Sequence, residues 1–269
     1  MNLPATETLE LQHDGFTLHV RLNRPTVRNA MSLQMVQELM AVFEAIAHEP
    51  GVRAVVLRGN GGHFCAGGDI KDMAGARVQA AESGNDEAYA TLNRAFGRLI
   101  TQVNHAPQVV IAALEGAVLG GGFGLACVSD VAISMDNAQF GLPETGLGVI
   151  PAQIAPFVVQ RIGMTQARRL ALLGARFNGV EALRLGIVHQ VVNSAEEIGM
   201  AVIEALTQVQ RCAPEANRAT KALLHRVGQE PLEGLLDDAA RQFARAVAGA
   251  EGAEGTMAFV QKRAPKWAE

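Results

Sequence analysis

The stretch GAVLGGGFGLAC, residues 116–127, places four glycines within five positions of an otherwise apolar part of the chain. The apolar runs QVVIAAL and DVAIS, which are typical of strands, flank it. Glycine inside an element costs about 0.5–1 kcal/mol relative to alanine, so the cluster indicates that the backbone itself is needed there. Its spacing fits neither the GxGxxG dinucleotide loop nor the P-loop with its Lys-Ser or Lys-Thr.

A second glycine-rich stretch, FCAGGDI at residues 64–70, also follows a predicted strand. Two such turns can aim backbone N–H groups at one carbonyl oxygen. Reactions that build negative charge on a carbonyl need donors about 2.7–3.1 Å from the developing oxyanion. Composition alone favours the simpler interpretation of two tight turns, and the wider sequence context is what supports an oxyanion site.

The order of predicted elements indicates an α/β fold with a mixed sheet and crossing helices. A hairpin with a turn at Asp14-Gly15 is followed by a helix capped by Ser32, and strands and helices then alternate. The chain is predicted to be almost entirely helical from residue 196 onward. Residues 74–88 are small and polar with weak periodicity, which predicts a mobile loop or a loose helix.

Composition bounds the class of protein. The 269 residues are 49% hydrophobic and 19% charged, a globular composition, and the net charge of −4 disfavours nucleic acid and anionic membranes as partners. Three cysteines without a CxxC pattern predict a reducing compartment, with neither disulfides nor a metal site. The first residues show no secretory signal, so we expect a cytoplasmic protein.

Five ordered motifs carry a family resemblance: LNRPTVRNAMS, VVLRGNGGHFCAGGDI, IAALEGAVLGGGFGLACVSD, FGLPETGLGVIP and FVQKRAP. With them, residues 8–265 resemble the enoyl-CoA hydratase/isomerase (crotonase) family. The resemblance implies a crotonase-like ββα superhelix with the CoA-thioester site over residues 1–195. It implies an α-helical trimerisation region over residues 196–269, and a homotrimer or a hexamer made of two trimers.

The resemblance also implies roles for particular residues. The N–H groups of Gly68 and Gly121 would hold the thioester oxygen of an acyl-CoA. Arg28 and Lys262 match basic positions that meet CoA phosphates, although ordinary surface charges would look the same. The backbone that holds the CoA adenine would comprise Ala66, Gly67, Asp69 and Ile70 beside Gly68. No metal or redox cofactor is implied, because CoA is carried by the substrate.

Glu144, in the PE motif, is the predicted catalytic carboxylate, because a buried carboxyl can move the protons of a hydration. Hydratases of the family commonly carry a second glutamate where this chain has Gly124. Three possibilities follow: Glu144 alone handles water and proton, it shuttles a proton in an isomerisation, or the oxyanion site serves another reaction such as decarboxylation. A non-catalytic acyl-CoA-binding protein is a further alternative.

The segment GLGVIPAQIAPFVVQRIG after Glu144, together with Gly124, is similar to a bacterial subgroup that hydrates 3-branched glutaconyl-CoA thioesters. Its substrates are 3-methylglutaconyl-CoA in leucine catabolism and isohexenylglutaconyl-CoA in acyclic terpene catabolism. Such acyl groups end in a carboxylate, which implies a basic or amide-rich pocket. Structural roles are predicted for the other conspicuous polar groups, Cys65, Cys127, His63, Glu115 and Asp130.

Overall fold

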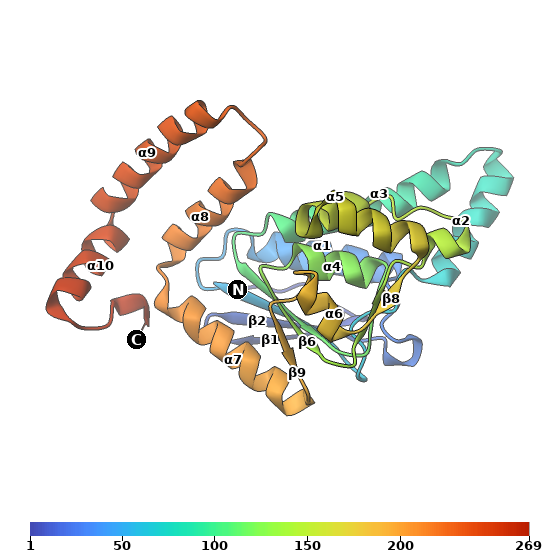
Figure 1. The fold of residues 1–269 in the computed structure, drawn as a ribbon, viewed down its shortest axis with the longest axis horizontal. Coiled ribbons are helices and arrows are strands. Elements are labelled where there is room, and N and C mark those ends of the chain that lie inside the picture. The colour runs from blue at the N-terminus through green and yellow to red at the C-terminus, as the bar shows by residue number, and fades with distance from the viewer. Residues whose placement is uncertain (269) are drawn as a thin grey trace. The chain divides into compact units, whose positions relative to one another are not determined.

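The computed structural model describes residues 1–268, whose strands form two sheets (Figure 1). The larger sheet has the order β1-β2-β3-β4-β6-β9. Only its first pair is antiparallel, as the predicted hairpin requires; every later pair is parallel. The strands are β1 (Leu9–Asp14), β2 (Thr17–Leu22), β3 (Ala54–Gly59), β4 (Val109–Leu114), β6 (Val131–Met135) and β9 (Gln190–Val192).

The smaller sheet places the opening glycine cluster. Strand β5 (Ala117–Leu119) pairs in parallel with β7 (Gln139–Gly141), and β8 (Arg176–Phe177) is antiparallel to β7. Helix α4 (Gly121–Val128) follows β5 directly. Its Phe123 meets Phe140 and Phe177 at ring-centroid distances of 6.2 and 6.0 Å, so aromatic packing joins the helix to this sheet.

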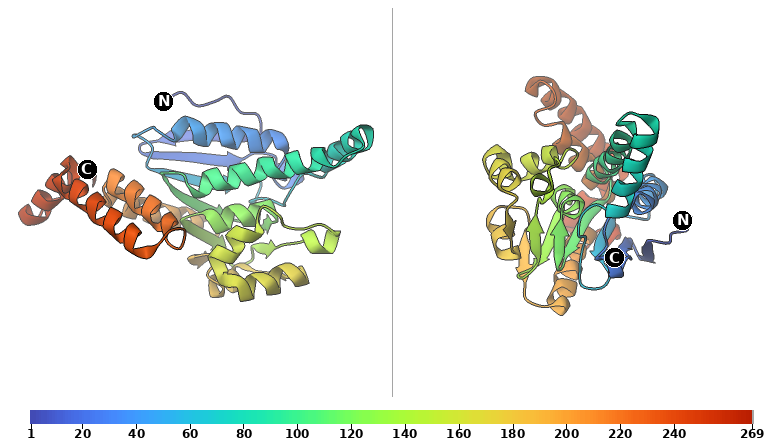
Figure 2. Two further views of the ribbon diagram at one scale, coloured as in Figure 1. Left: turned by 90° about the horizontal axis from the view of Figure 1, so that it is seen from above. Right: turned by 90° about the vertical axis from the view of Figure 1, so that its right-hand side faces the viewer.

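Four helices pack side by side on one face of the larger sheet, in the order α1, α3, α4, α5 (Figures 1 and 2). Helix α1 begins as predicted, with the Ser32 hydroxyl accepting from the Met35 N–H at 3.2 Å. Of the two possibilities for residues 74–88, the structure shows the helical one. The helices of this part are α1 (Leu33–Ile46), α2 (Ile70–Ser83), α3 (Glu87–Asn104), α5 (Ala155–Leu173) and α6 (Gly179–Arg184).

The chain divides into two compact units, residues 1–202 and the part from Ile203 onward. The division lies within α7 (Ala195–Arg211), whereas the predicted boundary at 195/196 lies at the start of that helix. The second unit contains α8 (Pro214–Arg226), α9 (Leu232–Ala248) and α10 (Ala250–Gln261). In it, Arg226 pairs with Glu230 at 2.6 Å and with Asp238 at 2.5 Å. Every helix between residues 1 and 268 is too short or too polar to cross a lipid bilayer.

Candidate active site

The two glycine-rich loops lie side by side. The Cys65 N–H donates to the Ala117 carbonyl and the Leu119 N–H donates to the Cys65 carbonyl, both at 2.9 Å, which pairs residue 65 in parallel with Val118. Both chains then continue to the same edge of the smaller sheet. There the Gly67 Cα lies only 3.4 Å from where a Cβ on Gly120 would stand. The structure thus brings the two predicted oxyanion segments together.

The Gly68 N–H points away from the two backbone hydrogen bonds that join its loop to Met31. The Met31 N–H donates to the Gly67 carbonyl at 2.8 Å, and the Asp69 N–H donates to the Met31 carbonyl at 3.0 Å. Backbone groups alternate in direction along an extended chain, so the Gly68 N–H between them points to the opposite side. Within residues 1–268 it has no hydrogen-bond acceptor, and Gly68 is exposed.

Gly121 is the first residue of α4, so its N–H belongs to the helix terminus that has no acceptor within the helix. This end of a helix also carries partial positive charge, which favours a developing anion. Gly120 before it adopts φ 50°, ψ −116°, a conformation that favours glycine, while its N–H donates to the Gly141 carbonyl at 3.1 Å. A Cβ on Gly121 would lie 3.3 Å from the Phe96 ring of α3, so this ring packs against Gly121.

Glu144 reaches the same place from strand β7. Parallel pairing of β5 with β7 puts their carboxyl ends at one edge, and the short helix η2 (Glu144–Leu147) begins there. The Glu144 Oε1 atom lies 2.9 Å from the position of a Cβ on Gly120. Its Oε2 atom is buried and has no hydrogen-bond partner within residues 1–268. Burial raises the pKa of this carboxyl, against a lowering contribution from its own backbone N–H.

Gly124 is buried under two isoleucines. A Cβ added there would lie 2.9 Å from Ile100 Cδ1 and 3.2 Å from Ile154 Cγ2. A carboxylate side chain at this position would therefore displace packed apolar groups. Ile100 comes from α3 and Ile154 from the segment that precedes α5, and these two side chains occupy the place of a second glutamate. Together with Phe96, which packs on Gly121, they form an apolar wall.

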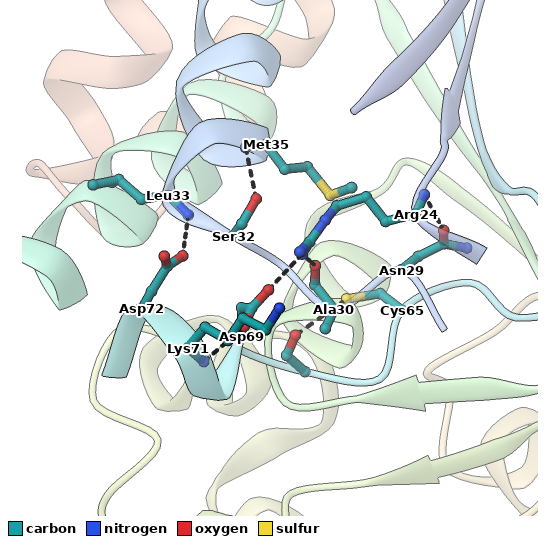
Figure 3. A network of polar contacts seen from close by, with 11 residues as sticks. Arg24, Asn29, Ala30, Ser32, Leu33, Met35, Cys65, Asp69, Lys71 and Asp72 are labelled. Atoms are coloured by element: carbon teal, nitrogen blue, oxygen red, sulfur yellow. Dashed lines mark hydrogen bonds and ion pairs between the residues drawn. The ribbon is translucent and has the colours of Figure 1, made fainter. Parts of the chain in front are cut away.

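An ion pair fixes the loop that carries Gly68 (Figure 3). Arg24 Nη1 lies 2.7 Å from Asp69 Oδ2 and also donates to the Ala30 carbonyl at 2.6 Å. Asp69 Oδ1 accepts from the Lys71 N–H at 2.8 Å and thereby caps α2. Burial alone would raise the pKa of Asp69, but the Lys71 N–H and the Arg24 guanidinium lower it. The residue after the Gly68 donor is thus held from two directions.

The predicted CoA-binding residues differ in how exposed they are and in whether their polar groups are already engaged within the protein. The Ala66 N–H donates to the Arg28 carbonyl at 3.0 Å, so the exposed Arg28 lies beside the first loop, in a left-handed conformation at φ 53°. Ile70 is 80% exposed. The side chain, the N–H and the carbonyl of Asp69 are all engaged within the protein, so its role toward CoA stays a prediction. Lys262 belongs to the second unit, and its role toward CoA stays a prediction.

The conspicuous polar groups around the loops have structural partners. Arg58 Nε lies 2.6 Å from Glu115 Oε2, and the Asp130 carboxylate accepts from the Val110 N–H at 2.7 Å. Burial raises the pKa of the Cys65 thiol to about 11 and of the Cys127 thiol to about 12. At neutral pH these thiols are protonated, as their predicted structural roles require.

Comparisons with known proteins identify the family of this chain. The family model for enoyl-CoA hydratase/isomerase matches residues 15–269. The structure of Pseudomonas aeruginosa AtuE is 63% identical, with a TM-score of 0.95 over 98% of this chain and 100% of its own. An enoyl-CoA hydratase/isomerase of Marinobacter aquaeolei is 65% identical, with a TM-score of 0.94 over 97% and 99%. The 2,3-dehydroadipyl-CoA hydratase of Escherichia coli is 30% identical over 92% and 93%.

The chain therefore belongs to the enoyl-CoA hydratase/isomerase family, and it is an enzyme of the hydro-lyase type that acts on acyl-CoA. The predicted crotonase-like fold is confirmed by these structural neighbours. The sequence did not mark Arg24 or the three apolar residues of the wall as part of the site. Arg24 stands in the motif LNRP, but its partner is 45 positions away, and no local pattern links the two.

Proposed function

We propose that this protein adds water to the 2,3-double bond of a 3-substituted glutaconyl-CoA, with Glu144 as its sole carboxylate for the reaction. The observation that carries the proposal is the unpaired, buried Oε2 of Glu144, whose carboxylate lies beside Gly120 between the two loops that carry N–H groups without acceptors, at Gly68 and Gly121. A buried polar atom without a partner is rare in folded proteins and suits a group that awaits water or substrate.

One carboxylate can complete the addition in two steps. Ionised Glu144 takes a proton from water while the water oxygen bonds to C3, and the electrons of the double bond move to the thioester oxygen. The N–H groups of Gly68 and Gly121 stabilise that oxyanion. Protonated Glu144 then gives its proton to C2, the thioester carbonyl re-forms, and the carboxylate is restored. The net change is one water added, with no other group required beyond the CoA of the substrate.

The apolar wall favours a substrate with a branch at C3. Where a two-glutamate hydratase has its second carboxylate, this chain has Ile100 and Ile154 packed over Gly124. Both isoleucines are buried, but the half-buried Phe96 beside Gly121 leaves apolar surface against which an alkyl substituent on C3 can pack. A methyl branch gives 3-methylglutaconyl-CoA and a longer one isohexenylglutaconyl-CoA. A relative named for 2,3-dehydroadipyl-CoA, a thioester that also ends in a carboxylate, supports this class.

We place the CoA moiety along the backbone from Ala66 to Ile70, with Arg28 near its phosphates. We propose a homotrimer, assembled through the second unit. Helix α9 supports this assembly, because Leu232, Leu236, Phe243 and Val247 are all more than half exposed and recur at helical spacing.

A panel of thioesters followed by mass spectrometry of the products tests the proposal. We expect a gain of one water on 3-methylglutaconyl-CoA and loss of this activity in Glu144→Gln, with thioester binding retained. The single carboxylate also suits an isomerase, which would shift the double bond of a 3-enoyl thioester without any gain in mass. Loss of carbon dioxide would indicate a decarboxylase. Turnover of Glu144→Gln near the wild-type rate would refute the role of this residue.

A further inference from the structure

A cluster of one arginine and two amides borders the apolar wall. Arg94 Nη1 donates to Gln153 Oε1 at 3.4 Å, and Gln153 Nε2 donates to Asn93 Oδ1 at 3.0 Å. A guanidinium has five N–H donors, and the single contact of Arg94 is long. Within residues 1–268, no carboxylate pairs with Arg94. Arg94 is therefore a cation with donors to spare.

This cluster lies one helical turn of α3 from the isoleucines of the wall. A Cβ on the buried Gly97 would lie 1.8 Å from Gln153 Oε1 and 2.6 Å from Arg94 Nη1, so both side chains fold over this glycine. Gly97 lies one turn before Ile100 on α3, Gln153 directly precedes Ile154, and these two isoleucines pack on Gly124. The polar cluster thus lies about one helical turn from the side chains that fill the place of the second glutamate.

Three other arginines of the first unit are already engaged. Arg24 is paired with Asp69, and Arg58 is paired with Glu115. Arg161 donates to the carbonyl oxygens of Ser129 and Ile187. None of these can turn to a ligand without breaking short contacts inside the protein, whereas Arg94 has only its long contact with Gln153 to give up.

We propose that Arg94, with the Gln153 amide beside it, binds the distal carboxylate of the acyl group, an inference that rests on the proposed function. A guanidinium offers two parallel N–H donors to a carboxylate, and such charge-assisted pairs are the strong ones. Glycine at position 97 leaves room for Arg94 and Gln153 to fold inward. The cluster then selects acyl chains that end in a carboxylate over neutral chains of equal length.

The test compares two saturated thioesters that differ only at the far end, glutaryl-CoA and pentanoyl-CoA, by calorimetric titration. We expect the wild-type protein to bind glutaryl-CoA more tightly. Arg94→Gln should weaken glutaryl-CoA binding by about tenfold or more, the effect of a lost charge-assisted hydrogen bond. Its binding of pentanoyl-CoA should stay within about twofold. Arg94→Lys, which keeps the charge, should retain part of the preference, and Arg168→Gln, at an exposed arginine of α5, is the matched control.

Equal binding of the two thioesters by the wild-type protein, or an equal loss of both in Arg94→Gln, would overturn the inference. The same variants are assayed for hydration of 3-methylglutaconyl-CoA, where Arg94→Gln should raise KM and leave kcat nearly unchanged. If the wild-type protein prefers glutaryl-CoA through Arg94 but hydrates no branched glutaconyl thioester, the carboxylate site stands and the proposed reaction falls. If it hydrates the branched thioester and Arg94→Gln leaves KM unchanged, the proposed reaction stands and the carboxylate site falls.

Discussion

Substitution of Gly120 should change both the position of the Glu144 carboxylate and the stability of the protein, and the two effects can be measured separately. In Gly120→Ala, the new Cβ would lie 2.9 Å from Glu144 Oε1 and 3.4 Å from the Gly67 Cα. Ordinary contacts of a Cβ begin near 3.4 Å, so the carboxylate must move by about 0.5 Å, whereas the backbone contact is already tolerable. The end of a glutamate side chain moves more easily than backbone does. The substitution therefore displaces the carboxylate.

Gly120→Ala should lower both the free energy of unfolding and kcat. Because Gly120 has φ 50°, an alanine there is strained by about 1–3 kcal/mol, which lowers the free energy of unfolding. A misplacement of about 1 Å in a reacting group costs about a hundredfold in rate, so a shift of half that size should lower kcat by about tenfold. The free energy of unfolding is measured by urea titration, and kcat with a 3-methylglutaconyl thioester at saturation.

Gly186→Ala is the matched control. Gly186 also has a positive φ, 76°, but a Cβ there would meet no atom within 4 Å. It should lose comparable stability while keeping the wild-type kcat. If Gly120→Ala is folded and turns over at the wild-type rate, the close approach of Glu144 to Gly120 has no part in catalysis and the reasoning fails.

Three further predictions concern the ion pair behind the first loop, the titration of Glu144 and the assembly of subunits. Asp69→Asn keeps a capping side chain but removes the ion pair with Arg24, and should cost about 1.5–3 kcal/mol of unfolding free energy at neutral pH together with part of kcat; unchanged values would contradict the role of the pair. Burial raises the pKa of Glu144, so the folded state holds this proton more tightly than the unfolded chain. Its contribution to stability is therefore complete below the ordinary 4.5 and is lost as pH rises through the raised value. Glu144→Gln should abolish that part of the pH dependence in urea titrations, and an identical pH profile would count against it. Phe243→Glu, on the exposed face of α9, should convert the proposed trimer to monomers in light scattering, and a trimer that persists would place the contact elsewhere.

Local patterns predicted most of the fold. The hairpin, the Ser32 cap and the strand before each glycine loop could be predicted because a turn residue, a hydroxyl or a run of β-branched residues determines them within a few positions. Residues 74–88 were ambiguous because α2 buries little apolar surface: Ala76 is the one buried residue of that helix in the described chain, so its periodicity is weak.

The motifs also predicted which segments carry the candidate site, but not what surrounds them. Gly124 marks the absence of a carboxylate, yet the sequence does not show that Ile100 and Ile154 fill its place, because these come from two other elements. The same holds for Arg24 and Asp69, whose pairing depends on a bridge between Met31 and Gly68 that no local pattern records. Contacts between residues that are far apart in the sequence depend on the topology of the fold, so they cannot be predicted from neighbouring residues alone.

The free N–H groups of Gly68 and Gly121 have a consequence for how this scaffold can change in evolution. Every residue except proline supplies the same N–H, so the ability to stabilise an oxyanion depends on the path of the backbone and survives most side-chain replacements. Positions such as 124, 100, 154 and 94 can then vary without dismantling that ability. A few substitutions around these two backbone N–H groups can therefore give the enzyme new substrates, and even new reactions, while the oxyanion site itself stays the same.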